Sequence, residues 1–209
     1  MDTASNWDFL APGYAEKRGF GRGLMPAEKR MLRKILAKAG NGPVLDVGCG
    51  PGRHVRFTNS MGINALGIDF SLGMLSEGRK LGNEQYVLGD ACAMPFASCS
   101  FGSVICMGNT IGSVDDPQKL AGEMLRVCKR SLLIDFRHEK GKKGSLKRGF
   151  DEGSYDIRVW TPGEAMSMLS TLSGDLEISL EKGQEVERGF FFYAIIRKNA
   201  IDDLYDSSA

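Results

Sequence analysis

The stretch from Val44 to His54, VLDVGCGPGRH, constrains the fold of this 209-residue chain more than any other. A short apolar run that contains an acidic residue passes there into glycines at every second position, Gly48, Gly50 and Gly52. This pattern is typical of a buried strand that turns sharply into a helix. Glycine allows positive φ and a close approach of a bound group, and the following helix offers unpaired N–H groups. A bare strand-to-helix turn needs one glycine, so this turn predicts a ligand.

The spacing of these residues limits the kind of ligand. The dinucleotide fingerprint is G-x-G-x-x-G, whereas the chain has G-x-G-x-G with Asp46 two residues before Gly48. A carboxylate at Asp46 would repel a pyrophosphate and would suit a ligand that carries an ammonium or sulfonium charge. S-adenosylmethionine is such a ligand, and the motif therefore disfavours NAD.

Composition excludes few function classes. The chain is 42% hydrophobic and 25% charged, with a formal net charge of +1, which gives no argument for nucleic acid or membrane partners. It contains no run of about 18 apolar residues and no basic and apolar leader, so we expect a cytoplasmic protein. Five cysteines without a C-x-x-C pair and two histidines predict neither a metal site nor a disulfide framework.

Strand and helix patterns alternate along the chain. Five strands are expected, at residues 44–47, 65–69, 86–90, 101–107 and 132–136. Their alternation with helices predicts a doubly wound α/β fold with a parallel sheet, whose ligands lie outside the carboxyl ends of the strands. Two further strands, at 176–180 and 190–196, have no helix between them and should form an antiparallel pair at one edge.

Acidic residues end the second and third strands. Asp69 lies 69 − 48 = 21 positions beyond Gly48, where a carboxylate can accept hydrogen bonds from ribose hydroxyls. The alternative role for Asp69 is a helix N-cap, which Ser71 can fill instead. The Asp90 carboxylate suits the amino group of adenine, and the Ala91 amide suits a ring nitrogen. A simple turn aspartate is the alternative for Asp90.

Three segments lie outside this alternation. Residues 1–25 combine aromatic side chains with a glycine-rich basic stretch, which predicts either a mobile lid or an extension that covers apolar surface. Residues 137–153 should be an exposed loop, and 199–209 a mobile tail. The loop carries a run of basic residues, Lys140, Lys142, Lys143, Lys147 and Arg148. These form either a solvated charge run or a contact with an anionic substrate or nucleic acid.

The motifs together resemble those of the class I S-adenosylmethionine-dependent methyltransferases, from about Trp7 to Arg197. The matching segments are VLDVGCGPG at 44–52, GID at 67–69 and GDA at 89–91. The resemblance implies a Rossmann-like sheet of seven strands, order 3-2-1-4-5-7-6, with the last strand antiparallel and helices on both faces. It also implies one domain over residues 1–198.

The resemblance implies a cofactor pocket for S-adenosylmethionine as well. Carried over by position, it comprises Tyr14, Asp46, Gly48, Cys49, Gly50, Gly52, Asp69, Phe70, Asp90, Ala91, Met107 and Asn109. The glycine turn would hold the methionine end, Phe70 a face of the adenine, and Tyr14 would fold over the cofactor. Arg18 or Arg22 would reach its carboxylate.

The acceptor side carries fewer motifs. Asn109 lacks the Pro-Pro-aromatic segment of enzymes that methylate DNA bases, and the GNT at 108–110 is similar to a segment of some small-molecule N-methyltransferases. Asn109 and His138 are the catalytic candidates, with His138 as a base or else an exposed loop residue. Substrate contacts are expected from the insert over 137–160, namely from Arg137, Tyr155, Arg158 and Trp160. An arginine there suits a carboxylate or phosphate, or pairs with Asp151 and Glu152.

The leading hypothesis is a monomeric or homodimeric enzyme that transfers a methyl group in line to a small molecule. One alternative is an RNA methyltransferase that grips phosphates with the basic loop over 140–148. The other is a non-catalytic subunit that binds S-adenosylmethionine. The sequence leaves the identity of the acceptor open.

Overall fold

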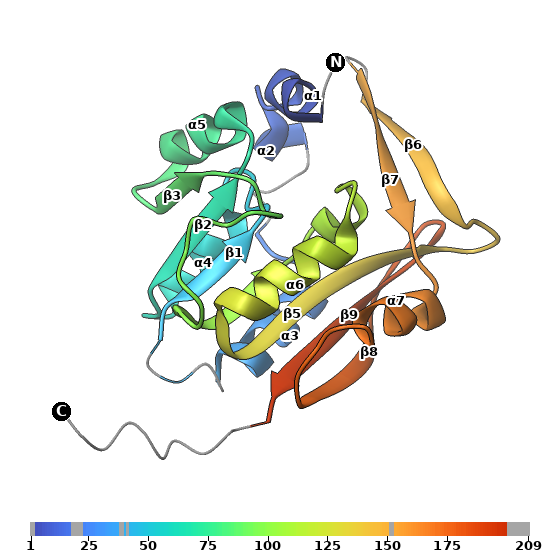
Figure 1. Ribbon diagram of the computed structural model, residues 1–209. Helices are drawn as coiled ribbons and strands as arrows, with labels where there is room; N and C mark the ends of the chain where they lie inside the picture. Colours follow the sequence, from blue (N-terminus) through green and yellow to red (C-terminus); the bar gives the residue numbers. More distant parts are fainter. Residues whose placement is uncertain (1–2, 18–22, 38–39, 41, 151–152, 200–209) are drawn as a thin grey trace.

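A computed structural model describes residues 3–17, 23–37, 40, 42–150 and 153–199. Its main sheet has seven strands in the order β3-β2-β1-β4-β5-β9-β8 (Figure 1). These strands are β1 (Val44–Val47), β2 (Ala65–Asp69), β3 (Gln85–Leu88), β4 (Phe101–Cys106), β5 (Cys128–Glu139), β8 (Leu176–Val186) and β9 (Gly189–Lys198). Counted within this sheet alone, the order is 3-2-1-4-5-7-6, which confirms the predicted fold.

The strand directions are also as predicted. β3, β2, β1, β4 and β5 run parallel, and β9 is antiparallel to both β5 and β8. The carboxyl ends of the parallel strands therefore meet at one edge, where a doubly wound sheet binds its ligands. The predicted Arg18 and Arg22 contacts and the tail from residue 200 fall outside the described residues.

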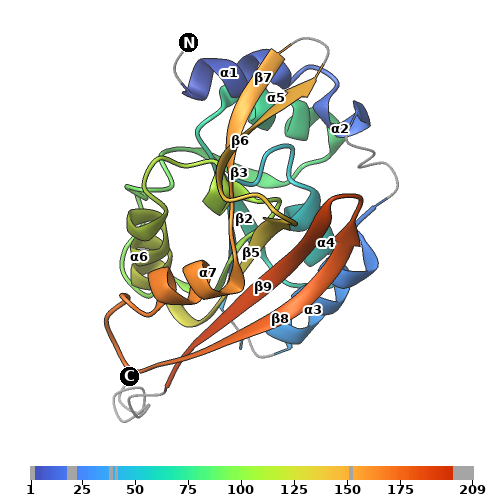
Figure 2. The same ribbon diagram turned by 90° about the vertical axis from the view of Figure 1, so that its right-hand side faces the viewer.

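Helices cover both faces of this sheet (Figure 2). Their bounds are α1 (Thr3–Leu10), α2 (Tyr14–Lys17), α3 (Pro26–Leu36), α4 (Arg53–Ser60), α5 (Leu72–Leu81), α6 (Pro117–Val127) and α7 (Pro162–Leu169), with a 3-10 helix, η2 (Thr110–Gly112). α6 and α7 pack on one face, where Phe136 and Leu120 belong to the larger core cluster. α3, α4 and α5 pack on the other, around Met31, Val55 and Leu75. Among the described residues, no helix has the length and apolar character needed to cross a membrane.

The exposed loop predicted over 137–153 is wrong. β5 continues to Glu139, and β6 (Gly144–Phe150) pairs antiparallel with β7 (Gly153–Val159) in a second sheet. The reason is visible in the alternation of side chains, since Tyr155, Ile157 and Val159 are buried while Asp156 and Arg158 are exposed. This period of two is a strand signal that the lysine-rich composition obscured. We call β6 and β7 the hairpin.

The hairpin and the first helix form a separate corner of the molecule (Figure 1). α1 lies beside α5 on one side and β7 on the other. Leu10 packs there with Tyr155, Ile157 and Val159, in a cluster apart from the two main cores. This corner stands above the carboxyl ends of the parallel strands.

Phe136→Ala is expected to lower the free energy of unfolding by about 3–5 kcal/mol, because it removes a fully buried ring and leaves a cavity. The Phe136 ring stacks on Phe192 at 5.2 Å between centroids and meets Trp160 edge-on at 5.4 Å. Urea unfolding measures the change. Phe9→Ala is the matched control, because Phe9 is 53% exposed and its loss should cost no more than about 0.5 kcal/mol. Equal losses in the two variants would contradict this account of the core.

Candidate active site

A cavity of about 1070 Å³ opens at the carboxyl ends of β1, β2 and β4. Its wall combines the strand ends with α1, α2, β7 and β9. The predicted site residues that line it are Tyr14, Gly48, Cys49, Gly50, Asp69, Phe70, Asp90, Ala91, Met107, Asn109, Arg137 and Tyr155. The fold thus brings together residues that lie up to 141 positions apart, from Tyr14 to Tyr155.

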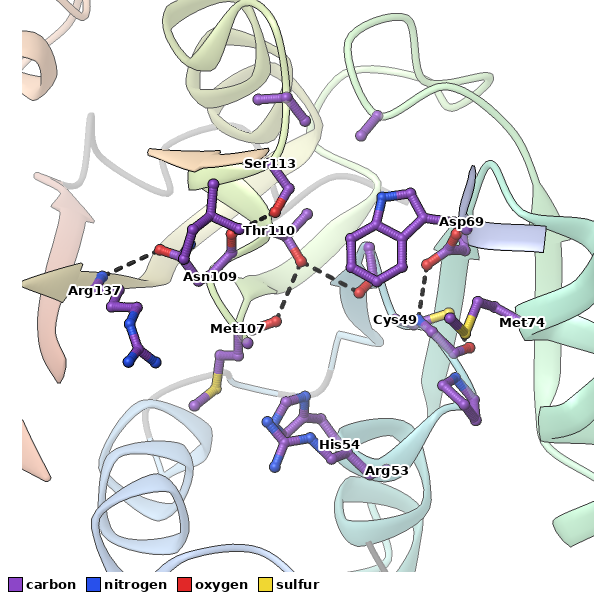
Figure 3. Close-up of a pocket in the computed structure, with 18 of the residues that line it drawn as sticks. Cys49, Arg53, His54, Asp69, Met74, Met107, Asn109, Thr110, Ser113 and Arg137 are labelled. Atoms are coloured by element: carbon purple, nitrogen blue, oxygen red, sulfur yellow. Dashed lines mark hydrogen bonds between the residues drawn. The ribbon is translucent and has the colours of Figure 1, made fainter. Parts of the chain in front are cut away.

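Asp69 joins the end of β2 to the glycine turn after β1. Its Oδ2 accepts a hydrogen bond from the Gly50 amide at 2.8 Å (Figure 3), and its Oδ1 accepts one from the Ser71 amide at 2.9 Å. Burial raises the pKa of Asp69 to about 6, and the nearby Asp46 adds to the rise against the effect of the two amides. Asp69 therefore lies at the cavity wall as a carboxylate at neutral pH. Its pKa is only about one unit below that pH.

The three glycines of the turn serve different purposes. All have positive φ, of 65° at Gly48, 52° at Gly50 and 77° at Gly52. A Cβ at Gly50 would meet nothing within 4 Å, so this position is open toward the cavity. A Cβ at Gly52 would lie 2.0 Å from the hydroxyl of Tyr86, and Gly52 does not line the cavity. The structure therefore shows that Gly52 is needed for close packing against Tyr86, and its contact with the cofactor stays a prediction.

Asp46 also lies behind the cavity wall and not on it, in contrast to the prediction. It is fully buried, with its Oδ2 3.7 Å from Nδ1 of His54, and His54 Nε2 lies 3.7 Å from Glu28 of α3. Burial and the Arg53 charge lower the pKa of His54, but the carboxylates of Asp46 and Glu28 outweigh them and raise it. The buried His54 ring between two carboxylates thus connects α3 with the strand that precedes the glycine turn.

Glu28 and Arg53 complete this buried charge cluster. Nη2 of Arg53 lies 2.6 Å from Oε1 of Glu28. Burial alone would raise the pKa of Glu28, but His54 and Arg53 lower it to about 2. Arg53 and His54 both line the cavity, and sequence reasoning missed them as site residues although they directly follow the glycine turn.

Asn109 is held in a strained conformation where β4 ends. Its φ is 64°, in the left-handed region that non-glycine residues rarely adopt. Asp135 of β5 fixes the turn, because its carboxylate accepts hydrogen bonds from the amides of Gly108 at 2.8 Å and Asn109 at 2.7 Å. The Asn109 side-chain oxygen accepts a further bond from the Arg137 amide at 3.1 Å (Figure 3). Burial raises the pKa of Asp135 to about 6 against these amides.

The structure places His138, Arg158 and Trp160 away from the lining of this cavity. His138 is a strand residue, with Nδ1 2.9 Å from the carbonyl of Trp160 and its ring 4.7 Å from that of Phe190. The guanidinium of Arg158 stacks 4.1 Å over the Trp160 ring. Arg158 and Trp160 both line a smaller surface depression beside α6 and α7. The alternation of side chains along β5 and β7 directs His138 and Arg158 to the opposite side from Arg137 and Tyr155.

Other lining residues were not predicted. They include residues of α1, the start of α3, η2 with its flanks, and the edge strands: Trp7, Leu24, Met25, Pro26, Thr110, Ser113, Val186 and Phe191. The hydroxyl of Thr110 donates to the carbonyls of Met107 and Gly48 at 3.2 and 3.4 Å and so joins the ends of β4 and β1. Trp7 had a local signal in the aromatic N-terminal segment, whereas Val186 and Phe191 had none.

Comparison with known proteins identifies the family. The family described as "Methyltransferase domain" matches residues 45–133. The chain is 34% identical over 146 residues to a demethylmenaquinone methyltransferase of Renibacterium salmoninarum, covering 66% of this chain and 60% of that protein. It is 39% identical over 153 residues to a candidate methyltransferase of Encephalitozoon cuniculi, covering 68% of this chain and 70% of that one. The chain thus spans about 60% of the length of the first of these relatives.

A solved structure extends this likeness to the whole fold. The CcbJ methyltransferase from Streptomyces caelestis has a TM-score of 0.76 to this chain, over 96% of this chain and 100% of that one, at 18% identity. The chain belongs to the class I S-adenosylmethionine-dependent methyltransferase family, as the sequence motifs predicted. The methyl donor of this family is S-adenosylmethionine.

His54→Gln is expected to destabilise the fold more at low pH than at high pH. The ordinary pKa of histidine is about 6.5, and a histidine with a higher pKa in the folded state stabilises the folded protein. This stabilisation is complete below the ordinary pKa, and it is lost as the pH rises through the pKa of the folded state. Urea unfolding at pH 6, 7.5 and 9 should therefore show a deficit that narrows toward pH 9. A deficit that stays constant with pH would show that His54 is neutral in the folded protein.

Proposed function

We propose that this chain transfers a methyl group from S-adenosylmethionine to a small molecule bound in the same cavity. The observation that carries the proposal is the continuity of the cavity from the cofactor motifs to the hairpin. Its volume of about 1070 Å³ is at the upper end of the range of about 300–1,000 Å³ that small-molecule sites occupy. A cavity of this size has room for a donor and an acceptor side by side.

The cofactor half of the cavity would use residues of β1, β2 and β4. Asp69 would accept the ribose hydroxyls, Asp90 and Ala91 would bind the adenine edge, and Gly48 to Gly50 would face the methionine end. Arg53 is a further candidate for the cofactor carboxylate, because its Nη2 lies 3.7 Å from the position of a Cβ at Gly108, at the mouth of the β4 turn. This arginine replaces Arg18 and Arg22 in the proposal.

The acceptor half is largely apolar. Trp7, Tyr155, Ile157, Phe191 and Leu24 line it, which favours an acceptor with an aromatic or aliphatic body. One relative, from Renibacterium salmoninarum, is named for such an acceptor, demethylmenaquinone. Demethylmenaquinone should therefore be the first compound in an acceptor screen. The exposed lysines at 140, 142 and 143 are not among the lining residues, which favours a small molecule over RNA.

The reaction requires alignment more than acid–base chemistry. When bound, S-adenosylmethionine would supply an activated methyl group on its sulfonium: the acceptor atom would provide the electron pair of the new bond, and the sulfur would keep the pair of the broken C–S bond. The rigid Gly108–Asn109 turn, tied to Asp135, would fix the acceptor side of this line. Holding reactants in such geometry yields effective molarities of about 10⁵ M or more. His138 has no part in this mechanism, because it lies away from the cavity.

Isothermal titration with S-adenosylmethionine, S-adenosylhomocysteine and NADH tests the cofactor assignment. We expect binding of both adenosyl ligands and little of NADH. Mass-spectrometric detection of a methylated product from an acceptor library then tests turnover, with bulk tRNA included for the RNA alternative. Binding without any methylated product would support the non-catalytic subunit, and no adenosyl binding would overturn the proposal.

Affinity for S-adenosylhomocysteine should fall below pH 6, because protonation of Asp69 removes the acceptor of the ribose hydroxyls. The folded pKa is about 6, and one linked proton weakens binding by up to about tenfold per pH unit below that value. Titrations at pH 5, 6, 7 and 8 measure this slope. Asp69→Asn should bind more weakly at pH 8 and lose the slope, and an unchanged slope in this variant would assign the titration to another group.

Arg137→Gln should raise the KM for the acceptor while leaving S-adenosylhomocysteine affinity nearly unchanged. Arg137 lines the cavity beside Phe191, with its guanidinium 5.5 Å from that ring. Arg158→Gln is the matched control, because the stacked Arg158 lies in the other depression. Steady-state kinetics on the acceptor found in the screen distinguish the two. An equal effect of both substitutions would place the acceptor elsewhere.

A further inference from the structure

The first helix, α1, lies at the cavity and contacts α5 on one side and β7 on the other. Trp7 of α1 and Tyr14 of α2 line the cavity, and α1 lies between α5 and β7 (Figure 1). The rings of Trp7 and Tyr155 are 4.8 Å apart. Any opening above the cofactor motifs at this corner therefore involves α1.

On the hairpin side the contact is apolar. Leu10, Tyr155, Ile157 and Val159 form a cluster of their own, with Trp7 and Leu146 packed against it. This cluster is separate from the two cores of the main sheet. α1 and the hairpin therefore share a small core that is independent of the cofactor strands.

On the α5 side the contact is polar. Oδ1 of Asp8 accepts hydrogen bonds from the hydroxyl of Ser71 at 2.6 Å and the amide of Gly73 at 2.8 Å. Ser71 is the N-cap of α5, and its own amide donates to Asp69 at 2.9 Å. Ser71 thus connects the Asp8 carboxylate to Asp69, which lines the cavity at the end of β2. The N-terminus of α5 also favours a negative charge at this point.

Gly73 makes this contact sterically feasible. A Cβ at Gly73 would lie 2.9 Å from the Cβ of Ala11 and 3.2 Å from the Cα and carbonyl oxygen of Asp8. All three of these atoms belong to the backbone or are bonded directly to it, so none of them can rotate away. Any residue larger than glycine would push α1 away from α5.

We propose that Asp8 is a latch, a positioning residue that holds α1 closed over the cavity, and that the seam between α1 and α5 opens to exchange the cofactor. α1 and the hairpin move as one unit, because they share a core. The exposed polar contact at Asp8 is the part that breaks. This inference rests on the proposed function only in using S-adenosylhomocysteine as the exchanging ligand.

Stopped-flow measurements of S-adenosylhomocysteine exchange test the latch. In Asp8→Ala and in Gly73→Ala, kon and koff should rise together by about threefold to tenfold, since each variant removes hydrogen bonds to a carboxylate or the space for them. Kd should change by less than either rate. If Asp8 only shaped the loop that carries Asp69 and Ser71, the substitution would instead raise koff alone. That result would overturn the proposal.

Matched controls separate the latch from general damage. Gly122→Ala in α6 is the control for Gly73→Ala, because a Cβ at Gly122 would meet nothing within 4 Å. It should leave both rates at their wild-type values. The double variant Asp8→Ala with Gly73→Ala should exchange no faster than the faster single variant, because both act on one contact. Full additivity of the two effects would also contradict the latch.

A measurement without ligand keeps the test independent of the proposed function. Hydrogen exchange of the peptide over residues 3–17 should be faster in Asp8→Ala and Gly73→Ala than in the wild type and Gly122→Ala. Unchanged exchange in this peptide would show that α1 stays docked without Asp8, which overturns the latch. If the wild type fails to bind S-adenosylhomocysteine while the difference in hydrogen exchange appears, the proposed function fails, and Asp8 still stands as the residue that holds α1 closed against α5.

Discussion

The site depends on buried carboxylates that accept backbone amides at the carboxyl ends of parallel strands. Where a strand ends in a turn, its amides lose their partners in the sheet, and leaving them unpaired inside the protein is costly. Asp69 accepts the amides of Gly50 and Ser71, and Asp135 accepts those of Gly108 and Asn109. Both carboxylates have a pKa raised to about 6 by burial. Holding the turns at the cavity wall thus requires two buried carboxylates, and burial makes their charged form less favourable.

A second layer of charge extends from the cavity wall into the protein, because Arg53 and His54 line the cavity while Asp46 and Glu28 lie behind it. His54 stands between Asp46 of β1 and Glu28 of α3, and Arg53 pairs with Glu28. Removing any one partner would leave a buried charge uncompensated. Asp46 therefore faces His54 behind the wall, while Asp69 faces the cavity itself.

The proposed cofactor half and the proposed acceptor half of the cavity differ in how they are built. The proposed cofactor half comes from strand ends of one sheet, within residues 48–109, and local motifs predicted most of the residues that line the cavity there. The acceptor half draws on α1, Arg137 of β5, β7 and β9, which meet only after the chain has folded. Substrate pockets of one fold vary in such attached segments, so their residues carry little local pattern.

The sequence by itself determined the doubly wound sheet, the edge pair of strands and the positions of Asp69, Asp90 and the glycine turn, because hydrophobic period and glycine spacing are local properties. Tertiary structure decided that residues 144–150 and 153–159 pair as a hairpin, that Asp46 and Gly52 lie behind the wall, and that His138, Arg158 and Trp160 lie away from the cavity. These outcomes depend on which face of a strand meets which neighbour. A side chain one position along a strand points to the opposite face, so Arg137 reaches the cavity while His138 does not.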